Sequence, residues 1–132
     1  MDLNTFLFVL GRILFGGYFV VSGLNHLTKL SMLTGYARSK KVPSPRLAVV
    51  VSGFMILLGG AGIILGVKIG WSVALLAVFL IVVTFKMHAF WRISDPNQRM
   101  SEQVNFMKNL ALLGAVFLIL QITDWPVGYG SY

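Results

Sequence analysis

The stretch from Leu47 to Leu65, LAVVVSGFMILLGGAGIIL, contains no charged residue. A transmembrane α-helix needs about 20 predominantly apolar residues, so this stretch is long enough to cross a bilayer. Three other stretches carry at most one or two ionisable residues each, which is the hydropathy signature of a span. They are Thr5–Leu24, Trp71–Thr84 (an extension to Trp91 being left open) and Phe106–Ile122.

The composition of the whole chain agrees with this interpretation. Of 132 residues, 57% are hydrophobic and only 11% are charged, whereas soluble domains contain about a quarter charged residues. A soluble domain of this length could not bury so much apolar surface. The short alternating segments of a membrane β-barrel are absent. We therefore predict an all-α fold: a single domain, residues 1–132, forming an integral membrane bundle of four transmembrane helices.

The basic residues are distributed unequally between the two sides of the predicted bundle. The first and third connections hold nearly all of them, whereas the opposite side has only Lys68. Positively charged loops stay in the cytoplasm, which predicts a multi-pass protein of the inner or plasma membrane with both termini outside. The net charge of +7 then suits anionic lipid headgroups as partners. We do not expect nucleic-acid binding, because no folded basic module is evident.

The first connection has a pattern of its own. Between Lys29 and Lys41, the residues Leu30, Leu33 and Ala37 fall on one helical face and basic residues surround the other. This pattern predicts a short helix lying in the membrane interface between the first two spans. It should end before Val42-Pro43, because proline disfavours a helical predecessor.

Glycines are dense in the second span, which includes a Gly-x-x-x-Gly spacing at Gly62–Gly66. Small residues allow transmembrane helices to approach closely. We interpret them as packing residues, either within the bundle or between protomers.

Polar residues gather at one depth near the predicted cytoplasmic side. With about 100° per residue, Ser22 and His26 share a face of the first span. Thr84, His88 and Trp91 share a face of the third. Intramembrane polar side chains point into a bundle or a wet cavity, so we predict a polar pocket there. Its candidate members are Asn25, His26, Lys86, His88, Trp91, Asn105, Lys108 and Asn109.

Arg12 lies about 10 Å into the first span from the opposite side, and no carboxylate shares its depth. It must therefore use backbone carbonyls, water, a neighbouring subunit's acid or a bound ligand. We include it among the cofactor-binding candidates with His26, His88, Trp91, Lys108 and Asn109. Bis-histidine haem ligation by His26 and His88 is a weaker alternative, since both lie at helix ends. The chain has no cysteine, so it offers no thiolate metal ligand, and we expect no metal site.

Several motifs follow one another along nearly the whole chain. They are Gly11-Arg12, Ser22–Leu27 (SGLNHL), Val42–Pro45 (VPSP), Leu58–Gly66 (LGGAGIILG), His88–Trp91 (HAFW) with Asp95-Pro96, and Phe106–Gly114 (FMKNLALLG). In this order they resemble the DoxX family of small four-helix membrane proteins. The resemblance implies membrane redox chemistry: thiosulfate oxidation feeding quinone in one branch, and complexes with oxidative-stress enzymes in another. Many DoxX-like chains carry an acid in the second span, but Ser52–Leu57 contains none.

Three functions remain open. The first is an accessory or membrane-anchor subunit of a larger redox complex, which packs through its glycine-rich helix against other membrane subunits or a second copy of itself. The second is a quinone-binding subunit of a membrane oxidoreductase, with His88, Trp91, Lys108 and Asn109 around the quinone headgroup. The third is a small-molecule transporter, which would require an oligomer because no internal repeat is evident. Thiols and nucleotide motifs are missing, so whether the chain catalyses a reaction by itself stays open.

Overall fold

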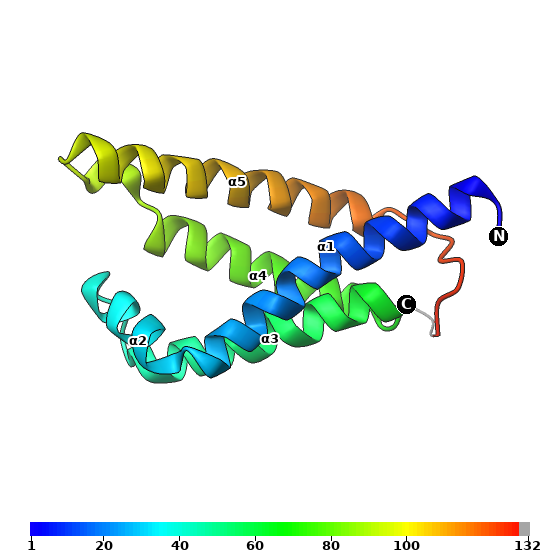
Figure 1. Cartoon of the computed structure of the whole chain (residues 1–132), viewed down its shortest axis with the longest axis horizontal. Helices are drawn as coiled ribbons and strands as arrows, with labels where there is room; N and C mark the ends of the chain where they lie inside the picture. Colours follow the sequence, from blue (N-terminus) through cyan, green and yellow to red (C-terminus); the bar gives the residue numbers. More distant parts are fainter. Residues whose placement is uncertain (130–132) are drawn as a thin grey trace.

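The computed structural model describes residues 1–129, and this part of the chain contains helices and no strand. The elements are α1 (Leu3–Thr28), α2 (Leu30–Ser39), α3 (Pro45–Leu65), α4 (Ile69–Met87), η1 (Phe90–Arg92) and α5 (Pro96–Leu120). The four long helices are apolar and long enough to cross a membrane, and α2 is the short helix expected between the first two (Figure 1). The predicted all-α bundle of four spans is confirmed.

Two helix boundaries differ from the prediction. Helix α5 begins at Pro96, ten residues before the predicted start at Phe106, and the Asp95 side chain accepts a 3.0 Å hydrogen bond from the Gln98 backbone N–H. An acidic N-cap followed by proline in the first turn is a favourable helix start, which outweighs the polar composition of that turn. Helix α4 ends at Met87, so the α-helix itself does not continue to Trp91. The chain forms the short 3₁₀ turn η1 there instead.

Helices α1 and α3 are antiparallel and their backbones touch. A Cβ atom added at Gly16 would lie 2.6 Å from the Gly60 carbonyl oxygen, and one added at Gly23 would lie 2.8 Å from the Gly53 carbonyl oxygen. Both pairs are seven residues apart on their own helices, which places them on one face. This glycine seam, Gly16–Gly60 and Gly23–Gly53, holds α1 against α3 along most of their length.

The other glycines of α3 contact α4 or end the helix. Gly59 and Gly62 pack against α4, at Leu76 and Ser72 respectively, and Gly66 caps α3 with φ +66°. Left-handed backbone at this position favours glycine because it has no Cβ. The two residues of the Gly62–Gly66 spacing therefore have different roles: Gly62 contacts α4, and Gly66 ends α3. The contacts between helices come from the seam and from the face toward α4, both within one chain.

Helix α5 packs against α4 and η1, whereas α1 packs against α3. Figure 1 shows α1 and α5 separating toward the end of the molecule where α2 lies. The apolar core sits nearer the other end and is formed by residues such as Phe19, Ile63, Leu76 and Val116. Large apolar side chains also cover the outside of the helices, including Phe54, Leu58, Val82 and Leu118. Lipid is the natural solvent for these outer faces, and the chain is a multi-pass membrane protein.

Candidate functional site

A cavity of about 410 Å³ lies between the helices at the α2 end of the bundle. Sites for small organic molecules occupy about 300–1,000 Å³, so its size suits such a ligand. The walls are mostly apolar, with Phe19, Val49, Phe79 and Leu80 among them. Five polar side chains that the sequence placed at this depth also line it, and they come from three helix regions: His26, Lys86, His88, Lys108 and Asn109.

Helix α2 closes part of the cavity on the side away from the core. Leu33, Tyr36 and Ala37 line the cavity from this helix. Ala37 is buried and Leu33 is partly buried, whereas Arg38 on the opposite face is exposed. The predicted amphipathic pattern therefore describes α2 correctly, and its apolar face covers the ligand-sized space.

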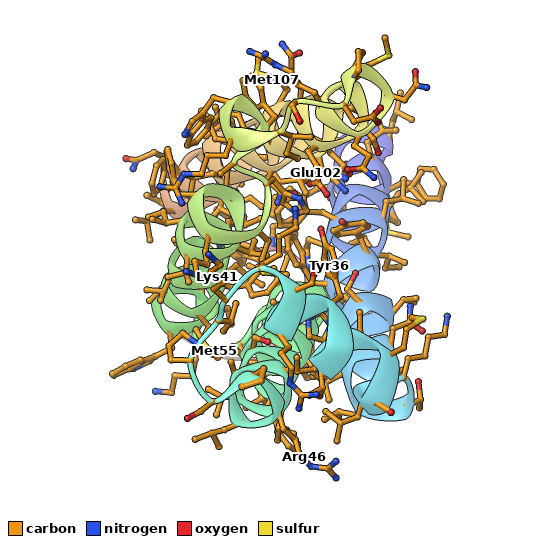
Figure 2. All side chains as sticks on the ribbon, turned by 90° about the vertical axis from the view of Figure 1, so that its left-hand side faces the viewer. Tyr36, Lys41, Arg46, Met55, Glu102 and Met107 are labelled. Carbon is orange, nitrogen blue, oxygen red and sulfur yellow. The ribbon has the colours of Figure 1, made fainter. Side chains whose placement is uncertain are left out.

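Glu102 links three elements at the mouth of this cavity. Its Oε2 lies 2.5 Å from Nδ1 of His88, which follows α4, and its Oε1 accepts a 2.9 Å hydrogen bond from the hydroxyl of Tyr36 on α2. The ammonium group of Lys40 lies 3.6 Å from the same oxygen. Figure 2 looks onto this end and shows Tyr36 and Glu102 turned toward each other between α2 and α5. The carboxylate thus ties α5 to α2 and to the end of α4.

The environment of Tyr36 changes its acidity. Burial raises the pKa of the Tyr36 phenol above its ordinary value, and the hydrogen bond to Glu102 and the charge of that carboxylate raise it further. All three causes disfavour a phenolate. Tyr36 therefore remains a hydrogen-bond donor to Glu102 over the physiological pH range.

The other cavity histidine and the lysine are also oriented by specific contacts. Nδ1 of His26 lies 2.8 Å from the carbonyl oxygen of Ser22, one turn earlier on α1, and its ring packs edge-on against Phe79. Lys108 extends from α5 toward α1, where its ammonium group lies 5.7 Å from the centre of the Tyr18 ring. Both contacts place nitrogen atoms at the boundary between α1, α4 and α5.

Three sequence candidates lie outside the cavity wall: Asn25, Trp91 and Asn105. Trp91 is 47% exposed and packs edge-to-face on Phe90 and Phe106. Asn105 is partly buried on α5, and neither residue is among those that line the cavity. The structure therefore brings His26, His88, Lys108 and Asn109 together and leaves Trp91 in an aromatic cluster beside them.

Arg12 belongs to the opposite end of the bundle. Its guanidinium group donates to three backbone carbonyls: Ile63 at 3.2 Å, Ile64 at 2.6 Å and Pro126 at 2.8 Å. It also stacks over the Trp125 ring at 5.3 Å from the ring centre. The carbonyls at a helix C-terminus carry partial negative charge, so the end of α3 is a favourable site for this cation. Among the alternatives open for Arg12, the structure provides backbone carbonyls.

Glu102 is the residue of this site that sequence reasoning missed. A signal was present: on one helix, Glu102, Asn105 and Asn109 are spaced three and four residues apart and share a face. The predicted start of the fourth span at Phe106 placed Glu102 in a connection and hid that relation. The Asp95-Pro96 pair, as a helix start, would have extended the helix far enough to reveal it.

The fold and the cavity define a class: an α-helical, multi-pass membrane protein with a ligand-sized space whose polar groups gather at one end of the bundle. The DoxX family model matches residues 7–89, which cover α1 through α4 and end just after His88. Since this match covers more than half of the chain, the protein belongs to the DoxX family. No curated protein and no solved structure matches the chain.

Proposed function

We propose that this chain binds the headgroup of a quinone in the cavity at the α2 end, and that it serves as an accessory subunit of a larger membrane redox complex. The observation that carries the proposal is the convergence of His26, His88, Lys108 and Asn109 on one apolar-walled cavity. A quinone headgroup is a flat ring with polar oxygens. Such a ligand needs apolar walls together with a few directed hydrogen-bonding groups.

The free-energy cost of unpaired polar groups favours a cavity that contains a ligand or water over an empty cavity. Polar side chains at membrane depth cost free energy when they lack hydrogen-bonding partners. Asn109 is only 6% exposed and lines the cavity. A quinone carbonyl would provide an acceptor for the amide of Asn109 and the ammonium of Lys108, while its ring would pack against the apolar wall.

The accessory role follows from what the chain contains. It has no cysteine, and its residues can bind and orient a quinone, whereas a partner subunit would exchange electrons with it. The glycine seam is occupied by α1 within the chain. We therefore expect the partner to dock on the outer apolar faces of the bundle, where residues such as Phe54 and Leu58 are exposed.

A binding measurement tests the proposal. We expect the wild-type protein, purified in mild detergent, to bind decyl-benzoquinone in equilibrium dialysis. A double variant, Lys108→Met with Asn109→Leu, should bind about tenfold more weakly, since it lacks two hydrogen-bond donors. The matched control is Arg99→Met with Gln103→Leu, which makes the same chemical changes at exposed positions of α5 and should keep wild-type affinity.

Two results would contradict the quinone site: a wild-type protein that binds no decyl-benzoquinone, or a double variant with unchanged affinity. Mass spectrometry of proteins copurified in the same detergent tests the accessory role. We expect subunits of a membrane oxidoreductase, and a protein that purifies alone from its native membrane would contradict this role.

A further inference from the structure

Both histidines of the chain line the cavity, and both are held through the same ring atom. Nδ1 of His26 faces the Ser22 carbonyl oxygen at 2.8 Å, and Nδ1 of His88 faces Glu102 Oε2 at 2.5 Å. A backbone carbonyl and a carboxylate can only accept hydrogen bonds. The proton of each neutral ring must therefore reside on Nδ1, which donates to these oxygens.

The other ring nitrogen is then an acceptor. In a neutral imidazole with its proton on Nδ1, Nε2 carries a free lone pair. Within residues 1–129, the hydrogen bond at Nδ1 is the only one that either ring makes. The cavity wall thus carries two imidazole acceptors, fixed in orientation by two different elements.

The network around Glu102 keeps this arrangement in place. Tyr36 donates to the other carboxylate oxygen and Lys40 lies beside it, so donors surround the carboxylate and it serves as the acceptor for His88. Two of the hydroxyls that line the cavity are already engaged: Tyr36 donates to Glu102, and Ser52 donates to the Val49 carbonyl. Neither Nε2 accepts a hydrogen bond from a residue in the described part of the chain, and a ligand can supply the donor.

Resting on the proposed quinone site, we infer that the cavity preferentially binds the reduced, dihydroxyarene form of its ligand, whose hydroxyl groups donate to Nε2 of His26 and His88. Glu102 is the positioning residue, because its carboxylate fixes the tautomer of the His88 ring. An oxidised quinone has carbonyl oxygens only, which are acceptors. It can use Lys108 and Asn109, but it leaves both imidazole acceptors without a donor.

The test compares two forms of one ligand. Decyl-benzohydroquinone under dithionite and decyl-benzoquinone in air are titrated into detergent-purified protein at about pH 8.5, where free imidazole is neutral. We expect wild type to bind the hydroquinone about tenfold more tightly, because two more hydrogen bonds form with this ligand than with the quinone. Glu102→Gln should lose most of that preference by weakening hydroquinone binding, since an amide can also donate to Nδ1 and reverse the tautomer. Lys40→Gln removes a contact of the same carboxylate without touching His88, so it should keep the preference.

Ring-nitrogen NMR of ¹⁵N-histidine-labelled protein provides a readout that a merely structural role would not change. At the same pH, both rings of wild type should show the Nδ1–H tautomer, and Glu102→Gln should alter the signals of one ring only. An Nε2–H tautomer at either ring in wild type would overturn the inference even if Glu102→Gln fails to fold. Equal affinity of wild type for the two ligand forms would overturn it while the quinone site stands. Binding of neither form would overturn both.

Discussion

Buried polar side chains have different surroundings at the two ends of the bundle. At the end where α1 begins and α5 ends, Arg12 donates to three backbone carbonyls of its own chain and is 5% exposed. At the α2 end, His26, His88, Lys108 and Asn109 surround a cavity of about 410 Å³. A charge that is satisfied by the backbone stabilises a fold, whereas polar groups around an open volume are available to a ligand. The contrast supports a structural role for one end and the proposed binding role for the other.

Gly66 shows how completely the Arg12 end is filled. A Cβ atom at this residue would lie 2.9 Å from Nη2 of Arg12 and 2.8 Å from Cα of Gly128. In the same region the Tyr129 backbone N–H donates to the Leu65 carbonyl oxygen at 3.2 Å. The guanidinium and the segment after α5 therefore seal the end of α3 together.

The largest expected effect is at this end. Arg12→Leu removes three charge-assisted hydrogen bonds and leaves buried carbonyls unpaired, so it should lower the free energy of unfolding by about 3 kcal/mol. Denaturation in mixed detergent micelles measures the change. Arg99→Leu, at an exposed arginine of α5, is the control and should be near neutral.

The quinone affinity of folded Arg12→Leu protein tests the other side of the comparison between the two ends. We expect Arg12→Leu to leave it within about twofold of wild type, because Arg12 does not line the cavity and distant sites act independently. A variant with wild-type stability and lost quinone binding would reverse the roles assigned to the two ends.

A smaller effect is expected in the glycine seam that joins the two ends. Gly60→Ala would place its Cβ 2.6 Å from the Gly16 carbonyl oxygen, so the backbones of α1 and α3 must separate. Overpacking of this kind costs about 2 kcal/mol. Gly17→Ala is the matched control, because a Cβ there meets nothing within 4 Å, and alanine is the better helix former. Thermal unfolding in detergent ranks the two variants, and equal stability would mean that the seam is looser than described.

The last prediction concerns which end faces the cytoplasm and involves little change in stability. From the distribution of basic residues, the α2 end should be inside. Since the chain has no cysteine, single-cysteine variants report orientation directly. In intact cells an impermeant thiol reagent should label Asn4→Cys and spare Arg38→Cys. Labelling of Arg38→Cys from outside would place the cavity mouth on the opposite side.

Much of the fold could be predicted from local sequence, because lipid exposure and helix length impose a strong pattern on each span. The four spans, the short α2 helix and the break before Pro43 follow from hydropathy, amphipathic spacing and proline geometry. The start of α5 was not predicted, because polar residues from Pro96 onward obscured a helix that begins well before its apolar part. The shared face predicted for His88 and Trp91 assumes a continuous helix, but α4 ends at Met87 and Trp91 does not line the cavity.

The sequence predicted which residues of the candidate site lie at the same depth in the bundle, but it did not predict which residues contact one another. Helical phase and distance from the span ends are properties of single helices, and they correctly brought His26, His88, Lys108 and Asn109 to one level. The sequence by itself also determined that Arg12 has no acidic partner within its own chain, because no carboxylate occurs near its depth.

Only the tertiary structure decided which partners these residues have. The antiparallel seam sets where α1 lies on α3, and this puts Arg12 beside the last carbonyls of that helix. The separation of α5 from α1 leaves the cavity, and the early start of α5 brings Glu102 to His88 and Tyr36. Each of these contacts joins residues from different helices, and their geometry depends on interhelical packing that no single segment encodes.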